Sequence, residues 1–331
     1  MVRCFLLAAL MLVPIGQATT RTSTTSLRVV VFPGGQAWPL WAAQDRGFFR
    51  DAHLAVETSY TPGSVFMMTN LLNGQFDIAL TNVDNVVAYD EGQGEVLVSA
   101  SADLFAFMGG NNGFLTLYVQ PDITRYADLK GKTLAVDAVT TGYAFVLREM
   151  LSAKGLAQSD YRLEPVGGTA LRWTALQQGR YAGALLNPHF DALATAQGFR
   201  LLGRATETLP HYQAIVGTAS RRWALGHEDT LVRFIRAYRA SVTWLCNPSN
   251  RAAALAIFRR HMPDVSQHIA SATYEEEFVN AGGFQPSLAL DVEGIRTVLV
   301  LRSQYGLPKK TLTDPAKYYD LTYYNRANAP R

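Results

Sequence analysis

The sequence contains only two cysteines, Cys4 and Cys246, among 331 residues. Cys4 lies in the N-terminal segment that we expect to be cleaved, so the mature chain keeps one cysteine and forms no internal disulfide. One cysteine also excludes a metal site of the cysteine-cluster type, and the six histidines show no metal-ligand spacing. The sequence therefore predicts no metal site and no cofactor.

Runs of like charge and long apolar segments are also missing. The 30 Lys and Arg residues and the 27 Asp and Glu residues are spread along the chain and leave a formal charge of +3. Because there is no basic run and no long basic and aromatic face, we expect no nucleic-acid partner. A membrane-spanning helix needs about 20 apolar residues, and no segment has that length, so we expect no stable membrane insertion.

The motifs of common enzyme classes are absent as well. The sequence has no G-x-S-x-G elbow, no P-loop and no set of Rossmann glycines. The segment GYAFVLREML places no nucleophile next to a base. These absences favour a protein without a catalytic group.

The first 18 residues, MVRCFLLAALMLVPIGQA, carry a targeting signal. Arg3 precedes an apolar run over residues 4–13, and Gly16 and Ala18 supply the small residues of a cleavage site. This order is typical of a secretory signal peptide. We expect cleavage near Ala18, a flexible polar leader over residues 19–26, and a periplasmic product.

The chain also contains an internal repeat. The segment GQFDIALTN at residues 74–82 returns as GRYAGALLN at residues 179–187, an offset of 105 residues (187 − 82). The same offset relates Val31 to Val136 and Pro62 to Gly167. Because each copy alternates strands with helices, it predicts a βαβαβ unit with a parallel sheet. We therefore predict an α/β protein with two similar, doubly wound lobes and a ligand cleft between them.

Two segments are expected to connect the lobes. Residues 107–114 read FMGGNNGF, and Gly109, Gly110 and Gly113 can adopt the backbone angles that a hinge needs. A plain loop is the alternative. We expect the return crossing near residues 211–217.

The remaining chain is predicted to be mainly helical. Helical patterns cover residues 228–246, 250–261, 266–279 and 292–305. The Tyr-rich tail DPAKYYDLTYY is expected to pack on a lobe rather than to bind a ligand, because aromatic residues usually indicate packing.

The cleft should lie where open α/β sheets bind ligands, beyond the carboxyl ends of the strands. Helix N-termini at these positions favour an anionic group on the ligand. The candidate ligand-binding residues follow the strands of both repeats. They are Gln36, Trp38, Ser64, Asn82, Asp84, Asp137, Thr140, Thr141, Tyr143, Gly168, Asn187 and His189.

Several candidates also have a structural interpretation. Trp38 could form an aromatic wall of the cleft or anchor the first helix. Asp84 and Asp137 could contact a cationic or hydroxylated ligand, but capping of the following helix is slightly favoured. For His189, nothing decides between a ligand contact and a surface position.

Three further polar residues lie at the expected rim. Asn82 and Asn187 end the third strand of each repeat, and we expect at least one of them to contact the ligand. Arg172 lies on the first turn of a helix and could pair with a ligand carboxylate, although a surface ion pair is the more common role of such a residue.

The segment PLWAAQDRGFFRDAHLAVE resembles the opening helix of the type II periplasmic solute-binding proteins of ABC importers. The segments LLNGQFDIALTNVDN, DLKGKTLAVDAVTTGYAFVLREML and VGGTALRWTALQQGRYAGALL are similar, in order and spacing, to the branch that includes sulfonate, taurine and nitrate binders and the thiamine-pyrimidine-precursor group. The resemblance covers roughly residues 27–217. It implies a receptor that encloses a small molecule and presents it to a membrane permease.

The resemblance also implies that the chain after Gly217 completes the first lobe. We expect lobe one to comprise residues 27–110 and 214–331, lobe two residues 111–213, and the protein to be a monomer. The missing lipobox cysteine implies a protein that is free in the periplasm.

Two alternatives to an importer receptor remain. The pyrimidine-precursor synthases of the same branch carry a cysteine cluster and a reactive lysine for a pyridoxal cofactor, so the single mature cysteine disfavours an enzyme. A ligand sensor that feeds a signalling partner is the other alternative, which the sequence does not separate from a transport receptor.

Overall fold

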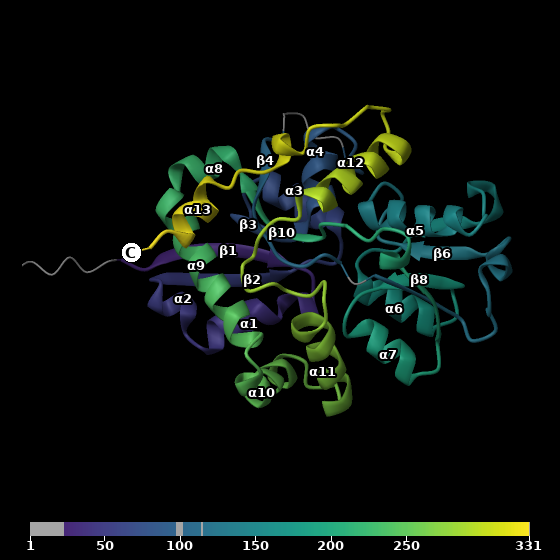
Figure 1. The fold of residues 1–331 in the computed structure, drawn as a ribbon, viewed down its shortest axis with the longest axis horizontal. Helices are drawn as coiled ribbons and strands as arrows, with labels where there is room; N and C mark the ends of the chain where they lie inside the picture. Colours follow the sequence, from purple (N-terminus) through teal and green to yellow (C-terminus); the bar gives the residue numbers. More distant parts are fainter. Residues whose placement is uncertain (1–22, 97–101, 114, 331) are drawn as a thin grey trace, which may run out of the picture.

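The computed structural model describes residues 23–96, 102–113 and 115–330, so the expected signal peptide lies outside the described residues. These residues form two bodies, each built around a five-stranded sheet (Figure 1). The two sheets confirm the predicted two-lobed α/β fold. No described helix is both long and apolar enough to cross a membrane.

Sheet A forms the core of one lobe. Its strands are β1 (Thr25–Val31), β2 (Leu54–Tyr60), β3 (Ile78–Asn82), β4 (Leu104–Gly109) and β10 (Ile215–Ser220), in the order β2-β1-β3-β10-β4. The predicted leader ended at Ser26, but β1 already begins at Thr25, whose backbone N–H donates to His53 O at 3.0 Å. Two residues of the predicted leader therefore belong to the sheet.

Sheet B forms the core of the other lobe. Its strands are β5 (Thr116–Val119), β6 (Thr133–Val136), β7 (Arg162–Pro165), β8 (Gly183–Leu186) and β9 (Arg200–Arg204), in the order β7-β6-β8-β5-β9. The lobe boundaries that we expect from the sequence remain a proposal, and the distribution of the strands between the sheets agrees with it.

The predicted parallel sheets are in fact mixed. β10 runs antiparallel to β3 and β4, and β5 runs antiparallel to β8 and β9. Each of these strands follows directly on a crossing between the lobes. The crossing reaches the sheet at the edge where the parallel strands end, so the next strand must run in the opposite direction.

The helices surround both sheets. They are α1 (Trp38–Asp45), α2 (Phe48–Asp51), α3 (Ser64–Leu72), α4 (Val83–Asp90), α5 (Gly142–Ala153), α6 (Thr169–Gln177), α7 (Phe190–Ala196), α8 (Arg221–Gly226), α9 (Glu228–Leu245), α10 (Arg251–His261), α11 (Gln267–Tyr274), α12 (Val292–Tyr305) and α13 (Thr322–Asn328). The predicted C-terminal helices are confirmed, except that the helix predicted over residues 266–279 continues beyond Tyr274 as a π-helix, Glu275–Val279.

The repeat predicted from the sequence is confirmed element by element. β1 and β6 end at Val31 and Val136, and α3 and α6 begin at Ser64 and Thr169, so both pairs differ by 105 residues (136 − 31 and 169 − 64). The two copies therefore present equivalent loops at the carboxyl ends of their strands.

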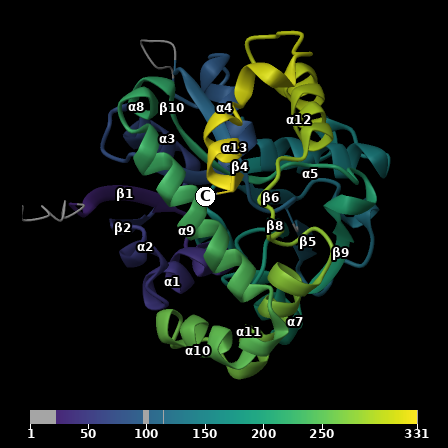
Figure 2. The ribbon, with the colours of Figure 1, turned by 60° about the vertical axis from the view of Figure 1, so that its left-hand side comes forward.

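The two faces of sheet A are covered by different helices. Val29 and Val31 pack in the core that includes α1, α9 and α10, whereas Val30 packs in the core that includes α3, α4 and α12, because successive strand residues point to opposite faces. Figure 2 shows α9 running across the front of this lobe. The second core also includes α5 of the other lobe, against which α12 packs.

The predicted glycine hinge is only partly correct. β4 includes residues 107–109, so the first crossing is confined to the residues that follow. Gly109 is held in the sheet, where an added Cβ would lie 2.2 Å from the Ala289 carbonyl oxygen. Of the three expected hinge glycines, Gly113 alone has a positive φ angle, 72°.

The Tyr-rich tail packs on the lobe of sheet A, as predicted. Tyr318 and Tyr323 are buried, and the ring of Tyr323 lies 5.9 Å from the ring of Phe105. α13 packs against α9 and β4.

Candidate ligand-binding site

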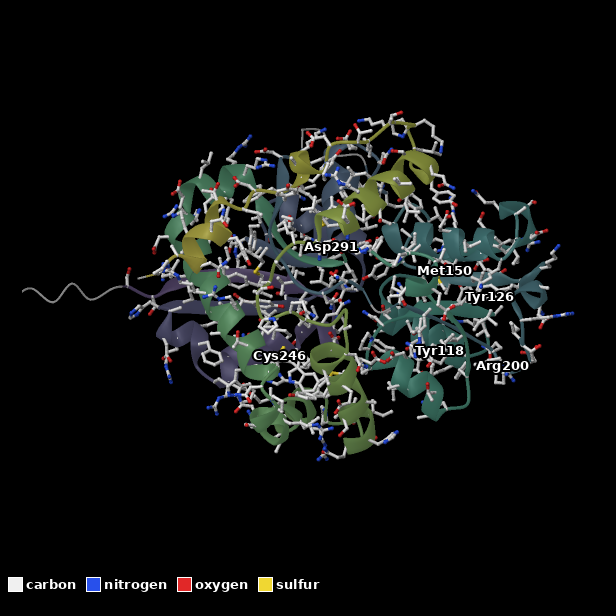
Figure 3. The ribbon with its side chains drawn as sticks, in the orientation of Figure 1. Tyr118, Tyr126, Met150, Arg200, Cys246 and Asp291 are labelled. Atoms are coloured by element: carbon white, nitrogen blue, oxygen red, sulfur yellow. The ribbon has the colours of Figure 1, made fainter. Side chains whose placement is uncertain are left out.

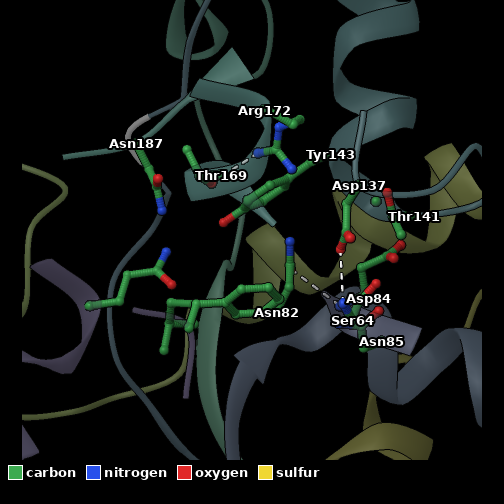
Figure 4. A pocket seen from close by; sticks show the side chains of 14 residues that line it. Ser64, Asn82, Asp84, Asn85, Asp137, Thr141, Tyr143, Thr169, Arg172 and Asn187 are labelled. Carbon is green, nitrogen blue, oxygen red and sulfur yellow. Dashed lines mark hydrogen bonds between the residues drawn. The ribbon is translucent and has the colours of Figure 1, made fainter. Parts of the chain in front are cut away.

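A pocket lies between the two sheets, at the carboxyl ends of their parallel strands (Figure 4). The volume inside it that the centre of a water-sized sphere can occupy is about 30 Å³. Eight of the residues expected from the sequence line it: Gln36, Ser64, Asn82, Asp84, Asp137, Thr141, Tyr143 and Asn187. The sequence thus located the pocket, and contact of these residues with a ligand stays a prediction.

The repeat also accounts for the positions of most lining residues. Four pairs of lining residues are equivalent in the two copies and differ by 105 residues (137 − 32 for the first pair): Phe32 and Asp137, Gln36 and Thr141, Ser64 and Thr169, Asn82 and Asn187. Three of the pairs are polar in both copies. The first pair has a phenyl ring in one copy and a carboxylate in the other, and this difference makes the two halves of the pocket unlike.

Arg172 is a buried cation in the pocket wall, on the first turn of α6. It is 3% exposed, and its guanidinium donates to the carbonyl oxygens of Gly167 and Leu185 and to Thr169 Oγ1, at 2.9, 3.2 and 2.9 Å. All three acceptors are neutral, and no carboxylate of the described residues forms an ion pair with it. Burial lowers the pKa of Arg172 while Asp137 opposes that shift, and an arginine stays charged under these conditions.

Asp137 connects the lobes at the edge of the pocket. Its Oδ2 accepts a hydrogen bond from the backbone N–H of Ser64 at 3.1 Å, at the N-terminus of α3. The predicted capping role was therefore assigned to the wrong helix, because the carboxylate caps α3 of the other lobe and not the helix that follows it. A second bond, from Gly168 N to Pro62 O at 2.8 Å, crosses between the lobes beside it.

Asp84 is fully committed to a buried ion pair. Its two carboxylate oxygens accept from Arg302 Nε and Nη2 at 2.7 and 2.6 Å, and the side chains of both residues are at most 1% exposed. Arg302 also donates to Thr140 O at 2.8 Å. The capping interpretation of Asp84 is wrong, because Asn82 is the residue that caps α4, by accepting from the Asp84 N–H at 3.3 Å. Contact of Asp84 with a ligand stays a prediction.

Uncharged polar groups also line the pocket or lie directly behind its lining residues. Asn82 Nδ2 donates to the Tyr212 hydroxyl at 3.4 Å, and the ring of Tyr212 lies 6.3 Å from that of Tyr143. Asn187 is 7% exposed, and its Oδ1 has no hydrogen-bond partner among the described residues. This amide is the lining group that most clearly lacks a protein partner.

Two expected residues lie in the interior instead. Trp38 is fully buried, and its ring centroid lies 4.3 Å from that of Phe258. The prediction that it anchors the first helix is therefore correct, and the prediction that it forms a wall of the cleft is wrong. His189 is 1% exposed and packs against Phe190, with ring centroids 3.9 Å apart. Burial lowers the pKa of His189 to about 4, so this ring is neutral at pH 7.

Two others lie next to the pocket rather than in its wall. The Thr140 hydroxyl donates to Glu95 Oε2. Gly168 is the residue before α6, and its N–H donates a hydrogen bond to the Pro62 carbonyl oxygen. The helices α3 and α6 begin at Ser64 and Thr169. Their N-cap residues are the preceding glycines, Gly63 and Gly168.

Six lining residues were not in the list of candidates, although Arg172 had been considered as a partner for a ligand carboxylate. They are Phe32, Asn85, Gly142, Thr169, Arg172 and Ile215. Thr169 and Phe32 could have been found by carrying the 105-residue offset through every candidate. Ile215 could not, because it begins the antiparallel strand that the sequence left undefined.

A buried acid lies behind the pocket. Glu277, on the π-helix, is fully buried, and neither of its carboxylate oxygens has a hydrogen-bond partner among the described residues. Burial and the charge of Asp191 raise its pKa to about 8, and Asn111 opposes that rise. The group is therefore mostly a neutral carboxylic acid at pH 7.

Cys246, labelled in Figure 3, lies away from the pocket. Its Sγ donates to Phe284 O at 3.5 Å, and burial raises its pKa to about 11. A thiol in this environment stays protonated and is a poor nucleophile.

Comparison with known families gives one match. Residues 35–252 match the model of the family described as NMT1/THI5 like. No curated protein sequence matches the chain.

Several solved structures share the fold. A protein of Bordetella bronchiseptica RB50 has a TM-score of 0.78 at 19% identity over 92% of this chain and 97% of its own. The alkanesulfonate-binding protein SsuA from Xanthomonas axonopodis pv. citri, bound to MOPS, has a TM-score of 0.72 at 19% identity, over 89% of this chain and 98% of its own. The periplasmic nitrate-binding protein NrtA from Synechocystis PCC 6803 has a TM-score of 0.76 at 12% identity, over 92% of this chain and 88% of its own. At these identities the likeness establishes the fold alone.

Proposed function

The chain belongs to the NMT1/THI5-like family, and from this premise we propose that it is an extracytoplasmic solute-binding receptor. It captures a small organic molecule in the pocket between its lobes and delivers it to the permease of an ABC importer. The family match, the two-lobed fold and the enclosed polar pocket support this function. The similar structures include proteins named for binding alkanesulfonate and nitrate.

The bound molecule carries an acidic group, and Arg172 is the observation that supports this. A buried guanidinium whose hydrogen-bond acceptors are all neutral has no ion-pair partner in the pocket wall, and an acidic group on the ligand would supply one. The guanidinium makes three hydrogen bonds with protein acceptors, and a planar fork with five N–H donors keeps capacity for an oxyanion.

Binding closes the two lobes on the ligand. Gln36 and Asn82 line the pocket from the lobe of sheet A, and Arg172 and Asn187 line it from the lobe of sheet B. A ligand that contacts both sets binds the closed form better than the open form, and only this difference in affinity drives closure. The bonds of Asp137 to Ser64 and of Gly168 to Pro62 form in the same movement.

The protein acts in the periplasm as a monomer without catalytic activity. The N-terminal pattern of residues 1–18 supports export. The only cysteine of the mature sequence has a raised pKa and lies outside the pocket, which gives an enzyme of the same fold no thiolate nucleophile.

A ligand screen with one variant tests the function. Isothermal titration calorimetry of the mature protein with small sulfonates, carboxylates, amines and pyrimidines should detect binding of at least one acid. Arg172→Met, which installs the residue found at the equivalent position 67 of the first repeat, should weaken that binding by at least about tenfold, or 1.4 kcal/mol.

Arg180→Met is the matched control, because Arg180 lies just after the same helix and is exposed. It should leave the affinity unchanged. Binding of amines or pyrimidines alone, or unchanged acid binding in Arg172→Met with an unaltered urea midpoint, would contradict an acid-binding receptor.

A further inference from the structure

Two charged side chains of opposite sign line the pocket without an ion-pair partner. Arg172 and Asp137 form no ion pair with any of the described residues, whereas the third charged lining residue, Asp84, is neutralised by Arg302. In Figure 4 each has its own uncharged partner, marked by a dashed line: Thr169 for Arg172 and Ser64 for Asp137. The charges influence each other, since Asp137 opposes the fall in the pKa of Arg172.

Both charges are departures from the internal repeat. The residue equivalent to Asp137 is Phe32 (137 − 105), and the residue equivalent to Arg172 is Met67 (172 − 105). Phe32 lines the pocket as an apolar group, and Met67 is buried in the core of α3. The lobe of sheet B therefore carries a positive and a negative group at positions where the other copy has neither.

The two helix N-termini of the pocket are consequently not equivalent for an anion. At α3, the N–H of Ser64 already donates to the Asp137 carboxylate, so an acidic group on a ligand would meet a like charge there. At α6, the first turn carries Arg172 and Thr169, and no carboxylate in the part of the chain that the structure describes forms an ion pair there. The acidic group thus belongs at α6.

From these contacts, and resting on the function proposed above, we propose that the ligand is a small zwitterion. Its acidic group pairs with Arg172 at the N-terminus of α6, and its ammonium group pairs with Asp137. The unpaired charges of the wall sum to zero, so a zwitterion enters without leaving net charge in the closed pocket. A simple anion would place a second negative charge near the half-buried Asp137 carboxylate and supply no cation for it, which is unfavourable.

Matched probe series test this assignment by calorimetry. The sulfonate series is aminoethanesulfonate, hydroxyethanesulfonate and ethanesulfonate, and the carboxylate series is the corresponding amino-, hydroxy- and unsubstituted propanoate. In at least one series the amino compound should bind at least about tenfold more tightly than the other two members. Asp137→Asn, which preserves an acceptor for the Ser64 N–H, should remove that preference and leave the affinity for the unsubstituted acid equal or higher.

Glu164→Gln is the control, because Glu164 is an exposed carboxylate on β7 of the same lobe, and it should keep the preference. The comparison of the three probes in the unmodified protein needs no variant, so it stands even if Asp137→Asn is unstable. Equal binding of the amino and unsubstituted acids overturns the zwitterion while the acid receptor stands. Equal weakening of the binding of all three probes of a series in Asp137→Asn also overturns the zwitterion and leaves the acid receptor standing. Failure of every probe to bind, amino compounds included, overturns both proposals.

Discussion

The ion pair between Arg302 and Asp84 is the most buried charged contact near the pocket. Arg302→Met should lower the free energy of unfolding by about 3 to 5 kcal/mol, because it leaves the Asp84 carboxylate buried without its partner. Urea unfolding followed by circular dichroism measures the change. Arg296→Met, on the same helix but exposed and paired with Glu293, should change stability by less than about 0.5 kcal/mol. Equal effects of the two variants would show that this pair does not hold α12 in place.

Glu277 should make stability fall as pH rises above neutrality. Its pKa is raised from 4.5 to about 8 in the folded protein, so its contribution is complete at low pH and is lost as pH rises through 8. His189 opposes this fall up to about pH 7.5, because its ordinary pKa of 6.5 leaves part of the unfolded population protonated there, and Asp90 and Asp191, with pKa values raised to about 6, are mostly ionised above pH 6.5. Between pH 6.5 and 8 the free energy of unfolding should therefore decrease by up to about 1.4 kcal/mol per pH unit.

Glu277→Gln should remove this dependence, because the amide does not titrate. Urea midpoints at pH 6.5, 7.25 and 8 provide the measurement. Glu57→Gln, an exposed acid on β2, should keep the slope of the unmodified protein. If Glu277→Gln keeps that slope too, the acid is not the titrating group.

For individual residues, the sequence predicted the positions of polar side chains better than it predicted their hydrogen-bond and ion-pair partners. Asn82, Asp137 and Asn187 were found because a strand end places the next side chain at the rim. The partner of Asp84 could not be found, because Arg302 is 218 residues away and lies on a helix outside the repeat. Arg172 was considered as a partner of a ligand carboxylate, but a surface ion pair was judged more common, since its burial depends on contact with β8, which lies outside its own helix.

Among the elements, β4 is held tightly at its end. Gly109→Ala should destabilise the protein by about 1 to 3 kcal/mol, because the new methyl group would collide with the Ala289 carbonyl. Gly226→Ala is the control, since it ends α8 with no atom within 4 Å of an added Cβ, and it should be neutral or slightly stabilising. Thermal unfolding of both variants decides the matter, and a neutral Gly109→Ala would mean that the segment around Ala289 can move away.

The order of elements in the repeat could be predicted almost completely from the sequence. Alternating strands and helices and a constant offset carry that information locally. The direction of β5 and β10 could not, because it depends on which edge of the sheet the chain reaches after leaving the other lobe. The helices α9, α10 and α12 were predicted closely because their apolar residues recur at helical spacing, as Leu231, Phe234 and Tyr238 do on α9.

For the whole molecule, closure can be measured directly. The radius of gyration from small-angle scattering should decrease when the unmodified protein is saturated with an acid that binds by calorimetry. At a ligand concentration that just saturates the unmodified protein, Arg172→Met should show a smaller decrease, because its weaker binding leaves more of it unliganded. An unchanged radius in the unmodified protein, at confirmed saturation, would contradict closure of the lobes.

The four equivalent pairs in the pocket wall have a consequence for how a ligand lies in it. A cavity with two identical halves would accept a ligand in two opposite orientations of equal energy, and a transporter would receive a mixture of both. The differences between the equivalent residues Phe32 and Asp137, and between Met67 and Arg172, remove this degeneracy. If the proposed binding site is correct, the divergence of the two copies at these positions gives the bound molecule a single orientation.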